Sequence, residues 1–439
     1  MATTNLKAFP YAEDVTCPKC KHQITLYDPE GSEFCVCDSC HSFIRFVAND
    51  TPVIQKQAPK MKQQPVLKPG SVGLFDGHSF KVIAYIEKKE KDASYAWREY
   101  ILYNYQKGYA NFAEYDGHWN FIAGKEFYPE LEKLANRNWG FINYEDNEYN
   151  VFNKYTAVIT ALTGEFDWDL LADKTKTTEF VAPPQIIYKE QDKQDTKTAD
   201  FYLGRYVKPA EVADAFKVDI KLFPERIGIG ANEPSVHAKR WFAASRLTPV
   251  LILLVAILGF IIASVNPEYQ VLDADYAIVN DSTKANEFKP FITPSFDLKN
   301  ATSSLNFQIR SAIDNNWLEA TVVLVNEKNN QSWEVTESIE YYHGYEDGEN
   351  WTEGSQEAEV LLSAIPAGKY HLNIYPASGD ISNKTIHINI MANPVLWRNF
   401  WVTILLLCLY PLYTWWRMRN YEKKRWMNSD YSPYETDEE

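Results

Sequence analysis

Cysteine is scarce in this chain of 439 residues, and it is unevenly distributed. Five of the six cysteines fall between residues 17 and 40, and the sixth is Cys408. The long stretch between them contains none, which excludes an internal disulfide framework there. The first residues, MATTNLKAFPYAED, also lack the apolar core of a signal peptide. We therefore expect the clustered thiols to be reduced.

Positive charge is scarce as well. The chain has 44 Lys and Arg against 59 Asp and Glu, a formal net charge of −15. This balance argues against nucleic acid as the main partner of the whole chain, because a polyanion is bound by basic surfaces. Aromatic residues, in contrast, make up 15% of the sequence, with 28 tyrosines. Such a composition favours β-strands over helical bundles.

The clustered cysteines form two pairs with the spacing of a zinc ribbon. Cys17 and Cys20 belong to CPKC, Cys37 and Cys40 end the run CVCDSC, and sixteen residues separate the pairs. Two tight turns of this kind present four thiolates to one tetrahedral ion, so we predict Zn²⁺ as a structural cofactor. Cys35 is then a spare thiol. Two disulfides are the alternative, but they require an oxidising compartment.

Two long uncharged runs predict membrane-spanning helices. The first, Leu247–Val265, would reach about 28 Å as a helix, which matches the hydrocarbon core of a bilayer. The second is predicted over residues 395–416, where Asn399–Trp416 carry no charge and tryptophans mark both ends. A buried core helix is the alternative for each run.

Basic residues flank the predicted spans on one side only, before the first span and after the second. They are Lys239, Arg240, Arg246, Arg417, Arg419, Lys423, Lys424 and Arg425. Between the spans, only Arg398 stands at the membrane face. By the positive-inside rule, both termini are cytoplasmic and residues 266–393 are extracytoplasmic. The lipid bilayer is thus a predicted partner.

The cytoplasmic part begins, after the ribbon, with a segment that lacks periodicity. Residues 49–66, NDTPVIQKQAPKMKQQPV, are rich in Pro, Gln and Lys, so we expect a linker that tethers the ribbon. Four runs rich in β-branched and aromatic residues follow and predict an antiparallel meander: HSFKVIAYIEK, AWREYILYNY, YANFAEY and HWNFIAGKEF.

Two Asp-Gly pairs, at 76–77 and 116–117, favour tight hairpin turns. We interpret the histidines that follow them, His78 and His118, as hairpin residues and not as metal ligands or catalytic groups. Further along, Pro209 predicts the start of a short helix that closes the β domain.

Several of these segments resemble, in the same order, the bacterial family DUF4178, whose members are often preceded by a zinc ribbon. The similar stretches lie within residues 66–216: WREYILYN, DGHW, LTGEFDW, APP and FYLGRYVKPAEVADAF. The family has no established activity. The resemblance therefore implies a domain type and a setting at the bacterial inner membrane, in membrane stress, but no catalytic residues.

The extracytoplasmic segment alternates short strand-like runs with turns, which predicts a β-sandwich. It holds 19 of the acidic residues and only 7 of the basic ones. Within residues 340–359, seven carboxylates are interleaved with aromatic residues, without a Lys or Arg. Carboxylates beside aromatic rings suit Ca²⁺ or an organic polycation such as a polyamine. The candidate cation site is made of Tyr345, Glu346, Asp347, Glu349 and Trp351. The alternative is a solvated hairpin that keeps the domain soluble.

The expected fold is mainly β, with a zinc ribbon, a cytoplasmic antiparallel β domain with a closing helix, and two transmembrane helices flanking an extracytoplasmic β-sandwich. The expected boundaries are 1–48 (zinc ribbon), 49–66 (linker), 67–220 (DUF4178-like β domain), 221–246 (juxtamembrane segment), 247–265 (first span), 266–393 (sandwich), 395–416 (second span) and 417–439 (cytoplasmic tail).

From this architecture we expect a non-enzymatic membrane sensor or adaptor that links the acidic outer domain, through protein partners, to the cytoplasm. An enzyme with its site in the cytoplasmic β domain is one alternative, although no nucleophile and base stand close in sequence. Nucleic-acid binding by the ribbon is another. Its basic residues are balanced by acidic ones, namely Lys19, Lys21, His22 and Arg45 against Asp28, Glu30, Glu33 and Asp38.

Overall fold

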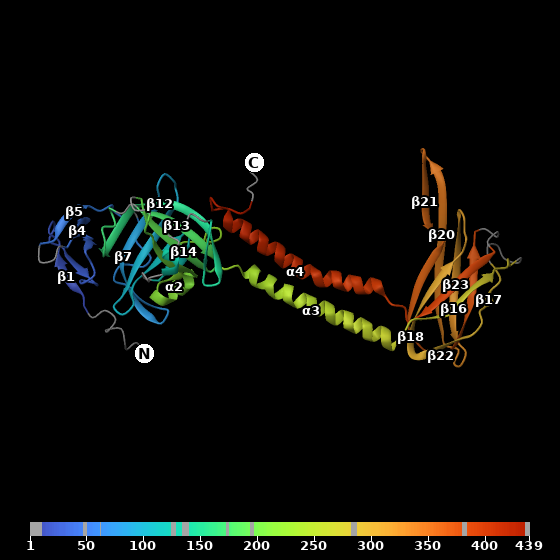
Figure 1. Ribbon diagram of the computed structural model, residues 1–439. Helices are drawn as coiled ribbons and strands as arrows, with labels where there is room; N and C mark the ends of the chain where they lie inside the picture. Colours follow the sequence, from blue (N-terminus) through green and yellow to red (C-terminus); the bar gives the residue numbers. More distant parts are fainter. Residues whose placement is uncertain are drawn as a thin grey trace. The chain divides into compact units, whose positions relative to one another are not determined.

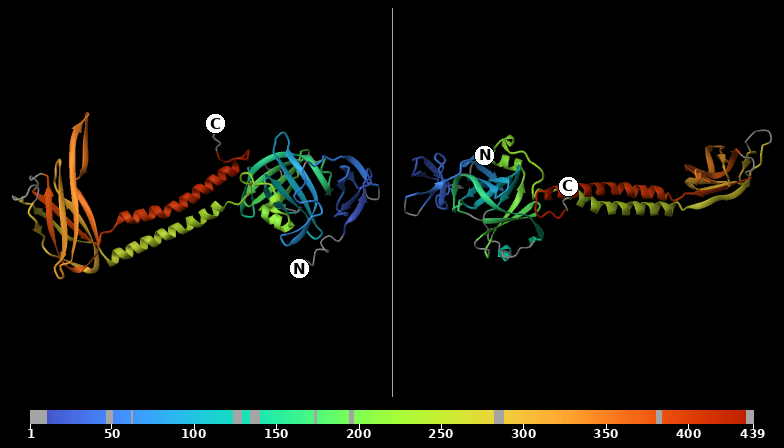
Figure 2. Two further views of the ribbon diagram at one scale, coloured as in Figure 1. Left: turned by 180° about the vertical axis from the view of Figure 1, so that it is seen from behind. Right: turned by 90° about the horizontal axis from the view of Figure 1, so that it is seen from above.

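The computed structural model describes residues 11–46, 51–61, 63–123, 129–133, 140–172, 175–193, 197–281, 288–379 and 384–434. The chain divides into two compact units (Figures 1 and 2). Met1–Ala243 and Leu412–Glu439 together form the first, which we call the barrel unit, and Ala244–Pro411 form the second unit. Both are built on antiparallel sheets, so the prediction of a mainly β protein is confirmed.

The barrel unit is built around a closed ring of eight antiparallel strands, the barrel. In spatial order they are β7 (His78–Glu90), β8 (Ala96–Asn104), β9 (Gly108–Tyr115), β10 (His118–Ile122), β15 (Asp200–Val207), β14 (Gln185–Asp192), β13 (Thr175–Ala182) and β12 (Asn147–Phe166). β12 pairs in turn with β7, which completes the ring. The predicted meander is confirmed as β7 to β10, while residues 124–127 of its last run lie outside the described residues.

β12 closes the ring because it is long enough to pair with different strands along its length. Its residues 150–156 pair with β13, and residues 157–164 pair with β7. The last part, Gly164–Phe166, also pairs with β3 (Phe34–Val36). Two register shifts, near Asn153 and Ala161, mark places where an irregular strand can bend. Closure pairs the backbone groups that an open edge strand would leave exposed.

The two faces of the barrel wall differ in what they pack against. One face is apolar and packs, through Tyr100, Phe112 and Trp119, against Phe216 of α2 (Pro209–Phe216) and against β6 (Val72–Phe75). The opposite face lines an internal cavity. α2 begins at Pro209, as predicted, because a proline at the first helical position lacks only an N–H that would have no partner there.

The remaining elements of the barrel unit are short. A second apolar cluster joins Leu131 of α1 (Pro129–Glu132) and Ile142 of β11 (Phe141–Tyr144) to β12, β13, β14 and β15. A 3₁₀ turn, η2 (Ile220–Leu222), follows α2. Both Asp-Gly pairs form the tight hairpin turns predicted for them, because Asp76, Gly77, Asp116 and Gly117 all have positive φ.

The cysteine-rich segment is joined to the barrel by strand pairing. β1 (Glu13–Thr16) and β2 (Gln23–Leu26) form a separate hairpin. β3, β4 (Ser42–Arg45) and β5 (Val53–Gln57) extend the barrel sheet, since β3 pairs with β12. Phe34 and Phe43 pack with Phe166 in one apolar cluster. The segment is therefore fused to the barrel and not only tethered to it.

The expectation of a linker over residues 49–66 is wrong for its central part, where residues 53–57 form β5. Lys56 forms an ion pair with Asp169 at 3.8 Å, and the Gln57 side chain donates a hydrogen bond to the Cys40 carbonyl oxygen at 2.5 Å. All five residues of β5 are exposed. Because backbone pairing holds this edge strand and no apolar face is buried, its sequence carries no strand periodicity.

The second unit contains a single antiparallel sheet of eight strands. Their bounds are β16 (Tyr269–Ala277), β17 (Phe291–Ile292), β18 (Phe296–Arg310), β19 (Asn316–Asn326), β20 (Ser332–Glu346), β21 (Glu349–Ser355), β22 (Glu357–Ser378) and β23 (Thr385–Ala392). The order is β16-β23-β18-β22-β19-β20-β21, with β17 paired to β22. We expected a sandwich of two sheets. All eight strands are instead joined by hydrogen bonds into one sheet, because the long β22 pairs with β18 through residues 357–370 and with β19 through residues 370–378.

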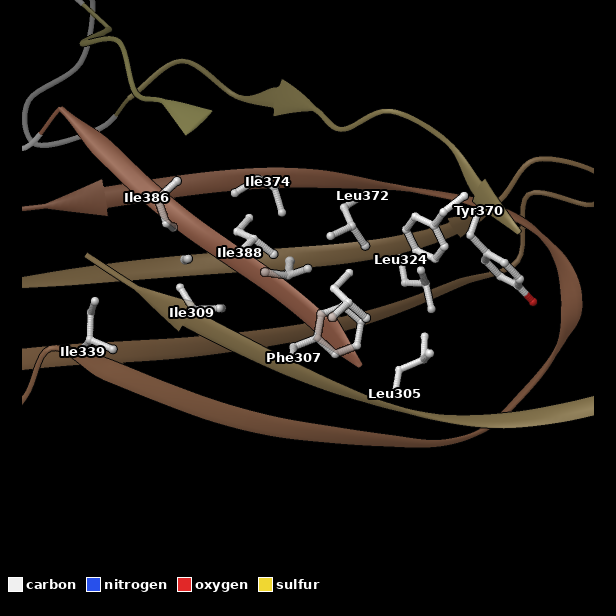
Figure 3. Close-up of a cluster of buried hydrophobic side chains, with 14 of the residues drawn as sticks. Leu305, Phe307, Ile309, Leu324, Ile339, Tyr370, Leu372, Ile374, Ile386 and Ile388 are labelled. Carbon is white, nitrogen blue, oxygen red and sulfur yellow. The ribbon is translucent and has the colours of Figure 1, made fainter. Parts of the chain in front are cut away.

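One apolar core fills the second unit (Figure 3). Phe307 and Ile309 of β18, Leu372 of β22 and Ile388 of β23 are at most 1% exposed. Alternate residues of β18, β19, β22 and β23 contribute to this core, which is the period-two pattern that indicated strands in the sequence.

Two helices of thirty residues each complete the chain, α3 (Val236–Val265) and α4 (Trp397–Trp426). By length and composition, α3 is the one helix among the described residues that is apolar enough to cross a bilayer. The second predicted span, residues 395–416, falls largely within α4. α4 also includes Arg398 and the basic run after Trp416. The two-span topology therefore stays a prediction.

Barrel closure gives a test at Gly164, which pairs with β3 on one side and β7 on the other. Its φ is +102°, and a Cβ there would lie 2.1 Å from the Ile83 carbonyl oxygen. We expect Gly164→Ala to destabilise the barrel unit by about 2 kcal/mol or more. Thermal unfolding of the full chain in detergent measures this. Gly140→Ala, where a Cβ meets nothing within 4 Å, is the control and should be nearly neutral.

Candidate functional site

Four cysteines converge in the ribbon at two equivalent turns. Cys17 and Cys20 lie in the turn between β1 and β2, and Cys37 and Cys40 in the turn between β3 and β4. In each turn, an amide four residues on donates to the carbonyl of the first cysteine, from Lys21 to Cys17 at 3.0 Å and from His41 to Cys37 at 2.8 Å. Both donor residues have positive φ, so the two halves share one backbone conformation.

The four Sγ atoms lie within 4.8 Å of one another. The Cys17–Cys40 and Cys20–Cys37 Sγ atoms are each 3.6 Å apart. A tetrahedral ion with metal–sulfur distances of about 2.3 Å requires sulfur–sulfur distances of about 3.8 Å, so the arrangement fits such an ion. These four cysteines could therefore hold a metal ion. Cys35 lies outside this group, buried on β3 beside Ile44.

The second predicted site lies at the tip of the hairpin formed by β20 and β21 (Figure 1). Tyr345 is 73% exposed and Trp351 is 41% exposed, and all of β21 is exposed. Glu346 and Glu349 face each other across the Asp347 turn. Among the described residues, only the four cysteines form a group of three or more His, Cys, Asp or Glu with converging ligand atoms. The structure thus places the predicted residues together along the chain without bringing their ligand atoms to one point.

A site that sequence reasoning missed lies inside the barrel, where the strands line a cavity of about 1100 Å³. This is larger than most small-molecule pockets, which measure roughly 300–1000 Å³. The side chains that line it come from alternate positions, such as Lys88 and Glu90 of β7 and Trp97 and Glu99 of β8. In an open sheet with one solvated face, such polar positions would face solvent. Because the sheet closes into a ring, they face inward.

Polar side chains inside the cavity are linked through aromatic rings. Lys88 pairs with Glu99 at 2.7 Å, and Glu99 also accepts a hydrogen bond from the Trp97 indole at 2.8 Å. The Trp97 ring contacts Tyr155 edge-on, at 5.0 Å between centroids. The Tyr155 hydroxyl in turn donates to the Glu179 carboxylate at 2.9 Å.

Glu179 is the most perturbed carboxyl in the cavity. Burial raises its pKa to about 7, and the neighbouring Glu90 adds to the effect, while the hydrogen bond from Tyr155 opposes it. Among the described residues, no Lys, Arg or His forms an ion pair with it. Near neutral pH this carboxyl therefore exchanges readily between its charged and neutral forms.

Two further segments line the cavity, and we call them the lid segments. They are residues 227–232, which precede α3, and residues 427–430, which follow α4. Trp426 packs on Phe152 of β12, and the Ser429 hydroxyl donates to the Phe152 carbonyl at 2.5 Å. Lys154 lies 4.8 Å from the centre of the Tyr431 ring.

Arg425, at the end of α4, ties the two lid segments together. It is 1% exposed. Its Nη1 donates to the carbonyls of Gly230 and Ala231 at 3.0 and 2.9 Å, and its Nη2 donates to Glu233 at 2.5 Å. Nε and Nη2 also donate to the Glu422 carboxylate. All five N–H groups of the guanidinium therefore have an acceptor, so its burial is fully compensated.

His118 holds the lid from the barrel side. Its Nε2 lies 3.1 Å from the Ile227 carbonyl, to which it must donate, so Nδ1 accepts from the Tyr206 hydroxyl at 3.1 Å. Burial lowers the pKa of His118. The lowered pKa favours the neutral form of this histidine, although the Glu233 carboxylate, 3.5 Å from Nδ1, opposes the shift.

Comparison with known proteins identifies the middle of the barrel unit. Residues 68–209 match the family described as "Domain of unknown function (DUF4178)", which confirms the resemblance for that part of the chain. No curated protein matches the chain.

Solved structures similar to the chain include those of the infectious bursal disease virus Gt and Gx strains, each with 8% identity and a TM-score of 0.18. The matches cover 82% and 87% of this chain. They cover 65% and 70% of the viral chains, so the chain spans about two thirds of the first one's length. Likeness at this level says nothing about the fold.

The cysteine cluster yields a test of ligand assignment. We expect Cys17→Ser to release the metal from the purified protein, because a tetrahedral site cannot lose one of four thiolates without a large loss of affinity. Cys35→Ser should keep the metal. Elemental mass spectrometry measures the metal-to-protein ratio of each variant. If Cys17→Ser keeps the metal and Cys35→Ser loses it, our set of ligands is wrong.

The Arg425 contacts yield a second test. Lysine has one nitrogen in place of the guanidinium fork, so Arg425→Lys should leave buried carbonyls unpaired at about 1–3 kcal/mol each. We expect amide hydrogen exchange in residues 227–233 and 427–430 to become at least about tenfold faster. Mass spectrometry on the full chain measures the rates. Arg419→Lys, at an exposed position of the same helix, is the matched control. Unchanged rates in Arg425→Lys would mean that Arg425 does not hold the lid.

Proposed function

We propose that this protein is a non-enzymatic membrane sensor or adaptor whose barrel holds a small molecule and reports its presence to the membrane. The observation that carries this proposal is the position of the lid segments. The cavity is lined at once by residues 227–232, which lead into α3, and by residues 427–430, which follow α4. A molecule in the cavity therefore touches, or lies close to, the segments through which both helices connect to the barrel.

A ligand in the cavity can change the lid segments only if it binds one arrangement of them more tightly than another. Bound and empty cavities would then differ in how firmly Arg425 and His118 hold the lid backbone. A change there is transmitted directly, because Arg425 belongs to α4 itself and Gly230 lies six residues before α3. The cavity size supports a ligand of ordinary metabolite dimensions.

The membrane arrangement in this proposal has two spans. α3 provides the first and the apolar part of α4 the second, with both termini in the cytoplasm of a bacterial cell. Basic residues before the first span and after the second support this sidedness. The second unit, with its strong excess of carboxylates, would then lie outside the inner membrane and meet a partner or ligand there.

The metal in the ribbon is, in this proposal, structural Zn²⁺. Four thiolates complete a tetrahedral shell and favour zinc over harder ions that prefer oxygen ligands. When bound, the ion would fix the two cysteine turns and with them β3, which pairs with β12. The ribbon surface would be free to contact cytoplasmic protein partners.

The topology on which this function depends can be tested by labelling in spheroplasts with a membrane-impermeant maleimide. Ser355→Cys, exposed on β21, should react at once. Lys176→Cys, exposed on β13, should react only after the membrane is permeabilised. Reaction of Lys176→Cys in sealed spheroplasts, or protection of Ser355→Cys, would contradict the proposed arrangement.

A further inference from the structure

We propose that the barrel cavity binds a small organic cation that carries N–H donors. This inference rests on the proposed function, because it assumes that the cavity holds a ligand. It is drawn from three features of the lining. These are the balance of charges, two hydrogen-bond acceptors that can take a further donor, and the aromatic rings beside them.

The charge of the lining is strongly negative. Nine lining residues are acidic and three are lysines, and no arginine is among them. The acidic ones are Glu90, Glu99, Glu114, Asp167, Glu179, Glu190, Asp192, Asp200 and Asp430. Of the three lysines, Lys88 is already paired with Glu99, and of the acidic residues, Glu114 is already paired with Arg98, which lies outside the lining. An anionic ligand would meet repulsion from this wall, whereas a cation would lower its electrostatic energy.

Glu179 supplies the carboxylate that such a cation would meet. Among the described residues, the Tyr155 hydroxyl donates a hydrogen bond to it, and the like charge of Glu90 adds to the rise in its pKa. A buried carboxylate without a cation is costly, and a ligand that brings the missing positive charge removes that cost. The pKa of about 7 means that this binding requires little energy for deprotonation at neutral pH.

Asn120 supplies a second acceptor beside the first. Its Oδ1 is buried and has no hydrogen-bond partner among the described residues, and its side chain lies close enough to the Tyr188 hydroxyl to oppose the rise that burial causes in the pKa of that hydroxyl. Tyr188 also stands directly across the strand pair from Glu179. The orphaned oxygen and the carboxyl thus flank one tyrosine, and both accept hydrogen bonds. A ligand with N–H donors satisfies both, but a quaternary ammonium satisfies neither.

Aromatic rings complete the environment of a cation. Trp97 and Tyr155 meet edge-on next to Glu179, and Tyr188 lies on its other side. A cation over such rings gains about 0.5–2 kcal/mol, more where water is excluded. Primary ammonium and guanidinium groups combine positive charge with N–H donors, so these are the head groups that the site fits.

The test compares three probes of nearly equal shape: 2-phenylethylammonium, 2-phenylethanol and 3-phenylpropanoate. Ligand-observed NMR titration of the full chain in nanodiscs, with empty nanodiscs as the blank, gives the three affinities. We expect the ammonium to bind at least about tenfold more tightly than the other two, as for a hydrogen bond to a charged group.

Two substitutions assign the preference to the site. Glu179→Gln should weaken ammonium binding at least about tenfold and leave the alcohol unchanged, because it removes the charge and keeps the shape. Asn120→Asp, which adds a carboxylate where the unpaired oxygen lies, should strengthen ammonium binding. Glu148→Gln, at an exposed position of β12, is the control and should change nothing. Equal thermal unfolding midpoints would exclude a loss of fold.

The outcomes separate this inference from the proposed function. Suppose that 2-phenylethanol or 3-phenylpropanoate binds as tightly as the ammonium, and that Ala113→Phe at the cavity wall removes that binding. The cavity then holds ligands of another class, so this inference is wrong while the proposed function stands. If ammonium binding is unaffected by Glu179→Gln, the inference also fails. If none of the three probes binds, both the inference and the ligand-holding role of the barrel are overturned.

Discussion

Closure of the ring by β12 is the constraint on which the barrel unit depends. A single strand of twenty residues, β12, pairs with β13, further along with β7, and at its end with β3. The first two pairings turn a sheet into a barrel, and the third attaches the cysteine-rich segment to it. Gly164 lies where β12 pairs with β3 on one side and with β7 on the other. A side chain there would collide with the backbone of β7, so only glycine fits this position without strain.

Closure also explains which parts of the fold the sequence predicts and which it does not. Strands β7 to β10, their Asp-Gly turns and the start of α2 at Pro209 follow from local patterns, because periodicity and turn chemistry act over a few residues. The direction in which the polar face of the sheet points does not follow from local patterns. Lys88, Glu99 and Glu179 are polar residues that would face solvent in a half-exposed sheet, and only the distant pairing of β12 with β7 places them inside.

The two candidate sites differ in the same way. The cysteine spacing lies within 24 residues, so the sequence brings the four thiols together through two local turns. The cavity draws on residues from 86 to 430. Arg425 illustrates why residues near the cavity could not be predicted from the local sequence. Its place in the run KKRW indicated the cytoplasmic side of a membrane span, and nothing local distinguishes it from Lys423 or Lys424, yet it is buried and bonded to carbonyls some 190 positions earlier.

The acceptors that Arg425 uses before α3 are all backbone carbonyls. Recognition of main-chain atoms does not depend on the side chains that those residues carry. The bonds from Arg425 thus place no demand on the side chains at positions 230–233, although other contacts do: a Cβ at Gly230 would lie 2.9 Å from His118 Nδ1, and the Asn232 amide donates to the Pro184 carbonyl at 3.0 Å. Insertion or deletion of a residue between Gly230 and the start of α3 would move the carbonyls out of reach, so the Arg425 bonds constrain the length of this connection.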